Sequence, residues 1–473
     1  MSKLFSTTSI PTISGRAGLP VLNRFARDEE GAILIASLFM LAGMILLGGI
    51  YFDMQQNELE RVRIQNTADR AVLAAADLDQ TMSPEAVVQD YFTKAGLPEH
   101  ANAITVDEGL NYRTVSVDAD TQTITRFMHL LGIDALPLRS FAEAEERVNN
   151  VEISMVLDIS GSMGEGTKMA ELRDAARTFV DAVINESTED LVSVSIVPYS
   201  EHVSAGPEIM SHLNVDWNNS YSHCIEFSES DFDSTTINAT ERFDQVQHFY
   251  WGTTSYNNLS NPVCPTGTYE DIVAFSQDTT ALKNKISQLV PRGSTSIFAG
   301  MKWAAALLDP EFQPITQELV ADGDADGAFV TRPAAFDDRE TLKTVILMTD
   351  GQNHYSYRID DQYYANDSHA LHWSRYNLDW YLYRYVSSRY HDQFKYLKYY
   401  PDYGDTLLDS ICDAAKDKNI VVWSIGFEVS DRGADVMESC ASSPSHFFRV
   451  EGVEIKDAFT AIARQINQLR LTQ

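Results

Sequence analysis

The sequence has few cysteines. Only four occur among 473 residues, and all four follow the one long apolar run of the chain. None of them form a Cys-x-x-Cys pair, which argues against the common zinc-site spacings. An even number on one side of a membrane-length segment favours two disulfides over four free thiols. Sequence order predicts the pairs Cys224–Cys264 and Cys412–Cys440, with buried reduced cysteines as the alternative.

Basic residues are also scarce. Lys and Arg together number 36 against 68 Asp and Glu, which gives a formal net charge of −32. Such a charge repels a phosphate backbone, so nucleic-acid binding is excluded as the main function. The same field attracts divalent cations and cationic surfaces. Function must therefore come from local sites.

Long apolar runs are absent except for one near the N-terminus. Gly31 to Phe52 contains no charged residue and is long enough to span the hydrocarbon core of a bilayer. The basic residues that precede it are Lys3, Arg16, Arg24 and Arg27. The positive-inside rule therefore predicts a transmembrane helix at 31–52, with residues 1–30 in the cytoplasm and the rest outside it. A cleaved signal peptide is the alternative, but the run is longer than an ordinary signal core.

Residues 53–150 predict a helical stalk followed by a small α+β module. Met54 to Leu78 is rich in Gln, Glu, Arg and Ala and has a rough helical period. Ser83 and Pro84 are typical of a helix start, which predicts a second helix ending near Lys94. Short alternating runs between residues 103 and 148 predict a small sheet.

From residue 151 to 473 apolar runs alternate with helical patterns. The predicted strands are residues 151–157, 191–197, 342–348, 419–427 and 446–450, and the predicted helices include residues 169–184, 297–308 and 407–416. Runs this continuous are typical of strands that are buried on both faces. The fold class is therefore α/β, with a doubly wound, mainly parallel sheet. Long insertions are predicted at about 201–271, 313–338 and 353–403.

Oxygen-bearing side chains gather at the predicted strand ends. The first strand runs into Asp158, Ser160 and Ser162, and a later strand into Asp350, while Thr295 precedes a predicted helix. The carboxyl ends of parallel strands meet at one edge of the sheet, so we expect these side chains to lie together. Hard oxygen ligands without thiol or imidazole favour Mg²⁺, or else Ca²⁺ or Mn²⁺, over zinc.

These residues resemble the metal-ion-dependent adhesion site (MIDAS) of von Willebrand factor type A domains. Asp158, Ser160 and Ser162 match its DxSxS element, Thr295 matches its separate threonine, and Asp350 its separate aspartate. Ser294 and Ser296 flank Thr295 and are the alternatives at that position. The resemblance implies a Rossmann-like fold and a metal held directly by the serine hydroxyls and partly through water by the aspartates. A partner Asp or Glu would complete the coordination, giving recognition without turnover.

Motifs of the common enzyme classes are incomplete. Gly161 and Gly166 have the P-loop spacing, but Thr167 precedes Lys168, the reverse of the order that a phosphate loop requires. No GxSxG element surrounds any serine. His369 and His372 lack the remaining ligands of a zinc site, which favours solvated histidines. The chain is therefore predicted not to be an enzyme.

An acidic loop at Asp322–Gly327 repeats the front half of a calcium-binding loop. Pro333 stands at its twelfth position, where such loops carry Glu. An acidic surface loop is therefore favoured, and a weak Ca²⁺ site is the alternative.

The insertion at 353–403 is rich in Tyr and Trp and directly follows Asp350. These residues are enriched at protein interfaces, which makes the insertion a candidate recognition surface beside the metal. A lid that buries its own rings is an equal alternative.

The two ends of the chain resemble the TadG-like proteins of bacterial Flp (tight adherence, Tad) pilus systems. The similarity lies in DEEGAILIASLFML and QNTADRAVLAAADL near the N-terminus and in FTAIARQINQLRLTQ at the C-terminus. Related pseudopilins usually carry Glu at the position of Ala36, so we expect the membrane anchor to be retained.

This resemblance implies a single-pass protein of the bacterial inner membrane with a periplasmic C-terminal domain. Its function would be assembly or anchoring of the pilus, through Mg²⁺-dependent capture of a carboxylate on a pilus or pilus-assembly component. A surface-exposed adhesin for host or neighbouring cells is the alternative.

Overall fold

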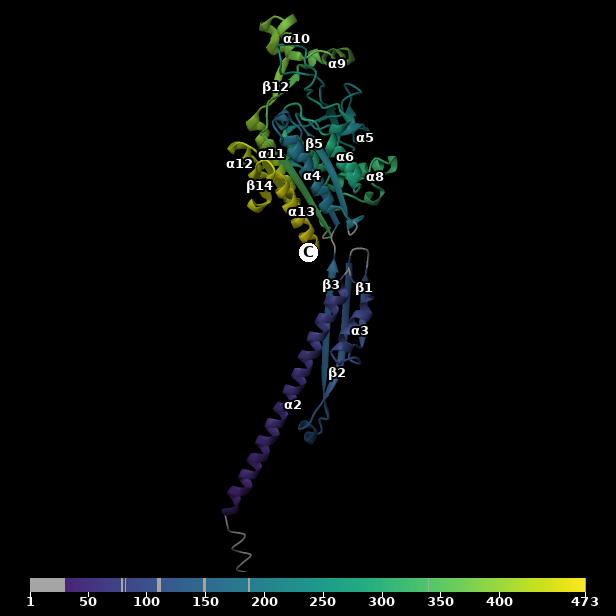
Figure 1. Cartoon of the computed structure of the whole chain (residues 1–473), viewed down its shortest axis with the longest axis vertical. Helices are drawn as coiled ribbons and strands as arrows, with labels where there is room; N and C mark the ends of the chain where they lie inside the picture. Colours follow the sequence, from purple (N-terminus) through teal and green to yellow (C-terminus); the bar gives the residue numbers. More distant parts are fainter. Residues whose placement is uncertain are drawn as a thin grey trace, which may run out of the picture. The chain divides into compact units, whose positions relative to one another are not determined.

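The computed structural model describes residues 30–77, 80, 82–108, 112–147, 150–185, 188–338 and 340–472. The chain divides into an N-terminal unit that ends at Glu146 and a C-terminal unit that begins at Arg147 (Figure 1). The segment predicted to be cytoplasmic, residues 1–30, lies outside the described residues except for Glu30. Each unit is described by itself below.

The N-terminal unit is built on one long helix. The predicted membrane span and the predicted stalk form a single continuous helix, α2 (Glu30–Ala76). Its most apolar stretch has a mean hydropathy of 2.5 and is only 6% buried, so this part of α2 is long and apolar enough to cross a membrane. The predicted transmembrane helix is therefore supported.

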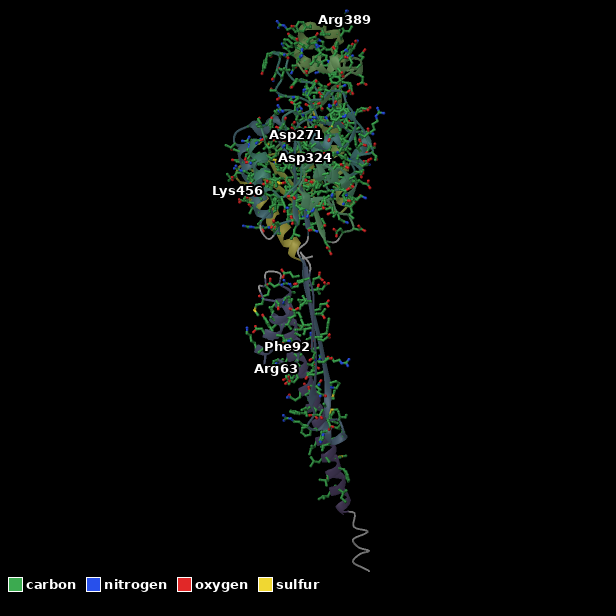
Figure 2. The ribbon with its side chains drawn as sticks, turned by 90° about the vertical axis from the view of Figure 1, so that its right-hand side faces the viewer. Arg63, Phe92, Asp271, Asp324, Arg389 and Lys456 are labelled. Carbon is green, nitrogen blue, oxygen red and sulfur yellow. A yellow bond between two sulfur atoms is a disulfide. The ribbon has the colours of Figure 1, made fainter. Side chains whose placement is uncertain are left out.

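The second half of α2 packs against the predicted α+β module. The other elements are α3 (Pro84–Lys94), β1 (Ala103–Glu108), β2 (Tyr112–Ile124), the 3-10 helix η1 (Met128–Leu131) and β3 (Ala135–Arg147), with the sheet order β1-β2-β3. Phe92 of α3 is fully buried, and Arg63 of α2 donates a hydrogen bond to the carbonyl of Ala95 (2.7 Å; Figure 2). Apolar residues of α2, α3 and the strands form one core.

The C-terminal unit contains a six-stranded sheet. Its order is β14 (Phe447–Val450), β13 (Val421–Phe427), β10 (Thr341–Thr349), β4 (Asn150–Asp158), β5 (Val192–Tyr199) and β9 (Val273–Ser276). Neighbouring strands from β14 to β5 pair in parallel, and only β9 is antiparallel. The predicted mainly parallel sheet is confirmed. The edge strand β9 was not predicted because four residues give too short a pattern.

Helices cover both faces of this sheet. One face carries α4 (Lys168–Val183), α6 (Thr279–Gln288) and α13 (Glu454–Thr472), and the other carries α7 (Ile297–Ala306), α11 (Pro401–Asp417) and α12 (Asp431–Cys440). The fold is therefore doubly wound, and cover on both faces explains the continuous apolar strands. Helix α11 begins at Pro401, inside the predicted insertion 353–403 and six residues before its predicted start.

Two of the long insertions pack into one lobe. Residues 201–271 contribute α5 (Gly206–Ser211), β6 (Asn214–Asp216), β7 (Ile225–Glu226) and β8 (Arg242–Gln245), and residues 353–403 contribute β11 (Ser356–Ile359), α9 (Asp367–Trp373), α10 (Leu378–Tyr385) and β12 (Lys395–Tyr399). Buried residues from both, such as Phe249 and Trp373, share a small core. The third insertion forms α8 (Gln313–Asp322), which joins the core of the domain.

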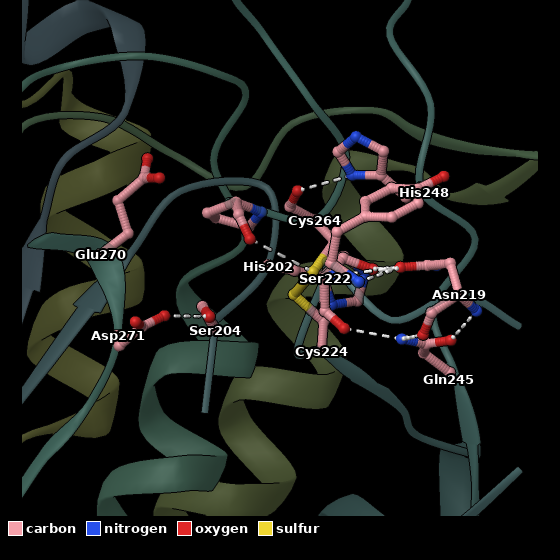
Figure 3. Close-up of a disulfide and its surroundings, with 12 residues drawn as sticks. His202, Ser204, Asn219, Ser222, Cys224, Gln245, His248, Cys264, Glu270 and Asp271 are labelled. Atoms are coloured by element: carbon pink, nitrogen blue, oxygen red, sulfur yellow. Dashed lines mark hydrogen bonds between the residues drawn. A yellow bond between two sulfur atoms is a disulfide. The ribbon is translucent and has the colours of Figure 1, made fainter. Parts of the chain in front are cut away.

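Both predicted disulfides are present. Cys224 and Cys264 close a loop within the insertion lobe (Figure 3), and Cys412 of α11 joins Cys440 of α12. The lobe disulfide lies among buried hydrogen bonds, since Gln245 Nε2 donates to the carbonyl of Ser222 at 2.6 Å. No free cysteine remains.

Candidate metal centre

Two carboxylates that are far apart in sequence meet at the ends of neighbouring strands. Asp158 is the last residue of β4, and Asp350 directly follows β10. These strands pair in parallel with Leu157 opposite Met348, so their carboxyl ends lie side by side. The next strand of the sheet after β4 is β5, on one side of this pair, and the next after β10 is β13, on the other side. Open α/β sheets bind ligands at such a reversal of the strand order.

Hydroxyl groups connect the two strand ends. The Oγ atoms of Ser160 and Ser162 lie 3.0 Å apart, and Ser162 Oγ donates to Asp350 Oδ1 at 2.6 Å. Ser162 lies in the 3-10 turn Gly161–Gly164, directly after the end of β4. Four of the five predicted ligands therefore form one connected set of oxygen groups, because Asp158 binds the same loop through the backbone N–H of Ser160 (2.7 Å).

Asp158 is fully buried and held by donors on both carboxylate oxygens. Oδ1 accepts the Ser160 N–H, while Oδ2 accepts the hydroxyls of Thr349 (2.7 Å) and Tyr199 (3.2 Å). Burial, together with the nearby charge of Asp350, raises the pKa of Asp158 to about 6. Asp158 therefore anchors the serine loop to the ends of the strands.

Lys168 is a member of the site that sequence reasoning considered only as part of a phosphate loop. It is the first residue of α4, and its Nζ lies 3.0 Å from Asp350 Oδ2. Glu428 and Glu165 are its more distant acidic neighbours, at 3.8 and 4.0 Å. Burial opposes its charge, but the Asp350 carboxylate raises the pKa of Lys168 above its ordinary value. The lysine therefore compensates part of the charge of Asp350.

Thr295, the fifth predicted ligand, lines a cavity of about 380 Å³ together with Gly161 and Ser162. Its backbone carbonyl accepts the N–H of His354 (2.9 Å). Ser294 Oγ donates to the carbonyl of Tyr355 (3.3 Å), whereas Ser296 Oγ is buried and has no partner among the described residues. The hydrogen bonds that join the other four ligands among the described residues do not include the Thr295 hydroxyl.

The wall of this cavity comes partly from the insertion lobe. Glu201 and Trp251 line it, and Glu201 accepts hydrogen bonds from Trp251 Nε1 (2.9 Å) and Ser356 Oγ (2.7 Å). Burial raises the pKa of Glu201 to about 7. Neither residue was predicted, because no local motif marks a wall that is assembled from loops distant in sequence.

The Tyr-rich insertion contributes to the cavity mainly through residues at its start. His354 lines the cavity and Ser356 supports Glu201. Farther along, Trp373 is 3% exposed within the lobe, while Tyr383 is 71% exposed. Some rings thus pack into the lobe and others face solvent.

The predicted donor set has the chemistry that a hard divalent cation takes. It consists of two carboxylates and three hydroxyls, at Asp158, Asp350, Ser160, Ser162 and Thr295. The described part of the chain holds no cluster of three or more His, Cys, Asp or Glu that fits a metal. Oxygen ligands of low total charge suit Mg²⁺, which usually keeps some coordination positions for water or an outside ligand.

The other candidate motifs have local structural partners. His369 Nδ1 accepts the backbone N–H of Ala365 (3.1 Å), and His372 stacks edge-on against Trp373. In the acidic loop, Asp322 lies 3.3 Å from His212 Nε2, and Asp326 caps a short 3-10 helix.

Known proteins resemble both parts of the chain. The family model of the Flp pilus-assembly TadE/G-like proteins matches residues 31–78. No curated protein matches the chain. The von Willebrand factor domain of the type V pilus tip protein Mfa5 from Porphyromonas gingivalis is 15% identical, with a TM-score of 0.36, over 69% of this chain and 97% of that one.

Two pilus proteins of other bacteria have TM-scores close to that of Mfa5. The pilus adhesin SpaC from Lactobacillus rhamnosus GG is 12% identical at a TM-score of 0.35, over 78% of this chain and 34% of that one. The adhesive tip pilin GBS104 from Group B Streptococcus agalactiae is 12% identical at a TM-score of 0.34, over 67% of this chain and all of that one. Since these scores lie below 0.5, the fold assignment rests on the sheet topology. The TadE/G-like match at residues 31–78, the apolar helix and the α/β domain together fit a TadG-like protein.

Proposed function

We propose that this chain is a membrane-anchored protein of Flp/Tad pilus assembly or anchoring, which binds a carboxylate of a protein partner through Mg²⁺. The ligands would be Asp158, Ser160, Ser162, Thr295 and Asp350. The observation that carries the proposal is the convergence of carboxylates and hydroxyls at the ends of β4 and β10. The TadE/G-like match supports the pilus context.

The chain's own residues prepare the site for recognition. Thr349 and Tyr199 hold Asp158 from behind, which fixes the Ser160–Ser162 loop before a ligand binds. A bound Mg²⁺ would supply an electrophilic centre for a partner Asp or Glu oxygen. The cavity beside Ser162 leaves room for the partner side chain, and Glu201 and Trp251 would set which neighbouring groups fit.

The proposed role is binding without catalysis. In the described chain, the groups around the two aspartates are hydroxyls, backbone amides and one lysine paired with Asp350. The protonated amine of Lys168 has no lone pair that could accept a proton. Asp158 already accepts three hydrogen bonds, so neither group is arranged as a general base.

The proposed location is the bacterial inner membrane, with α2 crossing it once. The N-terminus would lie in the cytoplasm and the α/β domain in the periplasm, where the two disulfides form.

Affinity capture tests the binding function. The full chain, immobilised in detergent, is exposed to a solubilised membrane fraction of cells that carry the pilus, with Mg²⁺ or with EDTA. Pilus components should be retained only with Mg²⁺ and only by the unsubstituted chain or the matched control Asp322→Ala, not by Asp158→Ala. Retention that survives both EDTA and Asp158→Ala would contradict the proposal.

Protease treatment of intact cells tests the location. A periplasmic domain is protected until the outer membrane is permeabilised. Cleavage in intact cells would instead favour a surface-exposed adhesin that uses the same site.

A further inference from the structure

The loop between β2 and β3 reaches α2 where its apolar span ends. This β2–β3 loop is defined as residues 124–134, from the last residue of β2 to the residue before β3; it contains η1 and belongs to the same unit as α2. Figure 1 shows that it meets α2 partway along, so the apolar N-terminal part of the helix extends beyond it. The contact is made at Gly49 to Asp53 of α2, the last turn of the charge-free run and the first acidic residue after it.

Specific contacts seat the loop on the helix. The Asp53 carboxylate is buried and accepts the backbone N–H groups of Arg126 (3.0 Å), Phe127 (2.7 Å) and Met128 (2.7 Å). A Cβ at Gly49 would lie 2.4 Å from the Phe127 ring, so only glycine allows this approach. These contacts fix the height of the loop along α2.

The seated loop presents apolar side chains to its surroundings. Ile124 is 80% exposed, Leu130 74%, Leu131 53% and Ile133 40%. A soluble domain rarely exposes several large aliphatic residues in one short loop. Arg126, His129 and Asp134 are the charged or titratable side chains of the same loop, and His129 pairs with Asp134.

The neighbouring surface of α2 has the same character. Met44, Leu47 and Tyr51 are each more than half exposed in the structure. The exposed apolar side chains of the loop therefore lie next to those of α2, at the end of the charge-free run.

We propose that the β2–β3 loop is a second membrane contact, which inserts Leu130 and its apolar neighbours into the lipid interface on the side where the α/β domain lies. This inference rests on the membrane anchor of the proposed function. A single helix fixes where a chain is attached but leaves its tilt free. A second contact seated at the end of the span restricts that tilt, and Arg126 is placed to meet anionic headgroups.

The experiment uses the full chain in vesicles of phosphatidylcholine and phosphatidylglycerol. Three variants that each add one cysteine, Met44→Cys, Leu130→Cys and Phe141→Cys, carry an environment-sensitive fluorophore on the added thiol. The four native cysteines are in disulfides and do not react. Met44 lies within the span, and Phe141, an exposed apolar residue of β3, is the matched control outside the loop.

The expected result is a shift to shorter wavelength and a loss of emission to spin-labelled lipids at Met44 and Leu130, with neither at Phe141. Shallow spin labels should quench Leu130 more strongly than deep ones, as an interfacial position requires. A Leu130 label that behaves like Phe141 while Met44 is quenched overturns the inference alone. Absence of quenching at Met44 overturns the membrane anchor and the inference with it.

Discussion

The metal centre and the acidic loop Asp322–Gly327 both gather carboxylates, but they do so in opposite ways. The loop takes its three aspartates from six consecutive residues, and Asp322 and Asp324 face solvent. The candidate metal centre takes one carboxylate from the end of β4 and one from the residue after β10, and both are buried. Solvated carboxylates already have water as a partner, whereas the buried pair is desolvated and repelling. The difference teaches that the same residue type has a different electrostatic setting when it is buried at strand ends than when it stands in an exposed loop.

The largest expected effect is on the Mg²⁺-dependent stability of the chain, which should depend on the candidate metal centre and not on the acidic loop. Mg²⁺ at about one hundred times its Kd should stabilise the unsubstituted chain by about 2.7 kcal/mol, because it binds only the folded state. This stabilisation raises the Tm, which is measured by thermal denaturation with and without Mg²⁺. Asp158→Ala should abolish the rise in Tm. Ser160→Ala and Ser162→Ala should reduce it less, since each removes one neutral ligand. An equal response of Asp158→Ala and the unsubstituted chain would contradict the metal assignment.

Lowering the pH should weaken Mg²⁺ binding at the candidate metal centre. The pKa of Asp158 is raised to about 6, so the folded chain holds a proton that the unfolded chain has already lost between about pH 4 and 6. Without Mg²⁺, this group stabilises the fold at low pH and loses that effect as the pH rises through about 6. Mg²⁺ competes with the proton, so its affinity should fall about tenfold at about pH 5. Calorimetric titration at several pH values measures this, and a flat profile would argue against Asp158 as a ligand.

Removing the positive charge of Lys168 should strengthen Mg²⁺ binding, which is the opposite of the effect of low pH. Lys168→Met leaves the Asp350 carboxylate without its partner at 3.0 Å. The chain should be less stable without Mg²⁺ and should bind Mg²⁺ several-fold more tightly, because a like charge no longer lies beside the ion. Lys168→Arg is the control that keeps the charge. Weaker Mg²⁺ binding by Lys168→Met would show that the lysine supports the site instead of competing with the ion.

The smallest expected effect concerns the acidic loop itself. Asp322→Ala should leave the Mg²⁺-dependent rise in Tm unchanged. Asp322 is exposed, and its close charged or titratable neighbour is His212 and not another carboxylate. The same thermal measurement checks it. A reduced response would mean that the loop takes up Mg²⁺ at the concentrations used.

Much of the architecture was predictable because burial on both faces leaves a direct pattern in the sequence. The runs that became β4, β5, β10 and β13 are apolar at nearly every position, and their order gives the doubly wound fold. The disulfide pairs were also predictable from cysteine order. The edge strand β9 and the early start of α11 were not, since short or half-exposed segments carry a weak period.

Residues of the candidate site could be predicted where a polar side chain directly follows an apolar strand. Asp158, Ser160 and Ser162 stand together in sequence, and Asp350 follows an unmistakable strand. Lys168 and Glu201 have no such mark. Their roles depend on where the first turn of α4 and the loop after β5 lie in space.

The sequence by itself determined the membrane-length helix, the mainly parallel sheet and the set of oxygen side chains at its edge. The helix and the sheet follow from local apolar patterns, and the oxygen set follows from Asp158, Ser160 and Ser162 at short spacing and from Asp350 directly after an apolar strand. Tertiary structure alone decided that Lys168 pairs with Asp350, that two insertions share one core beside the metal centre, and that the β2–β3 loop seats on Asp53. These contacts join residues tens to hundreds of positions apart, and burial and hydrogen bonding select them only after the chain has folded.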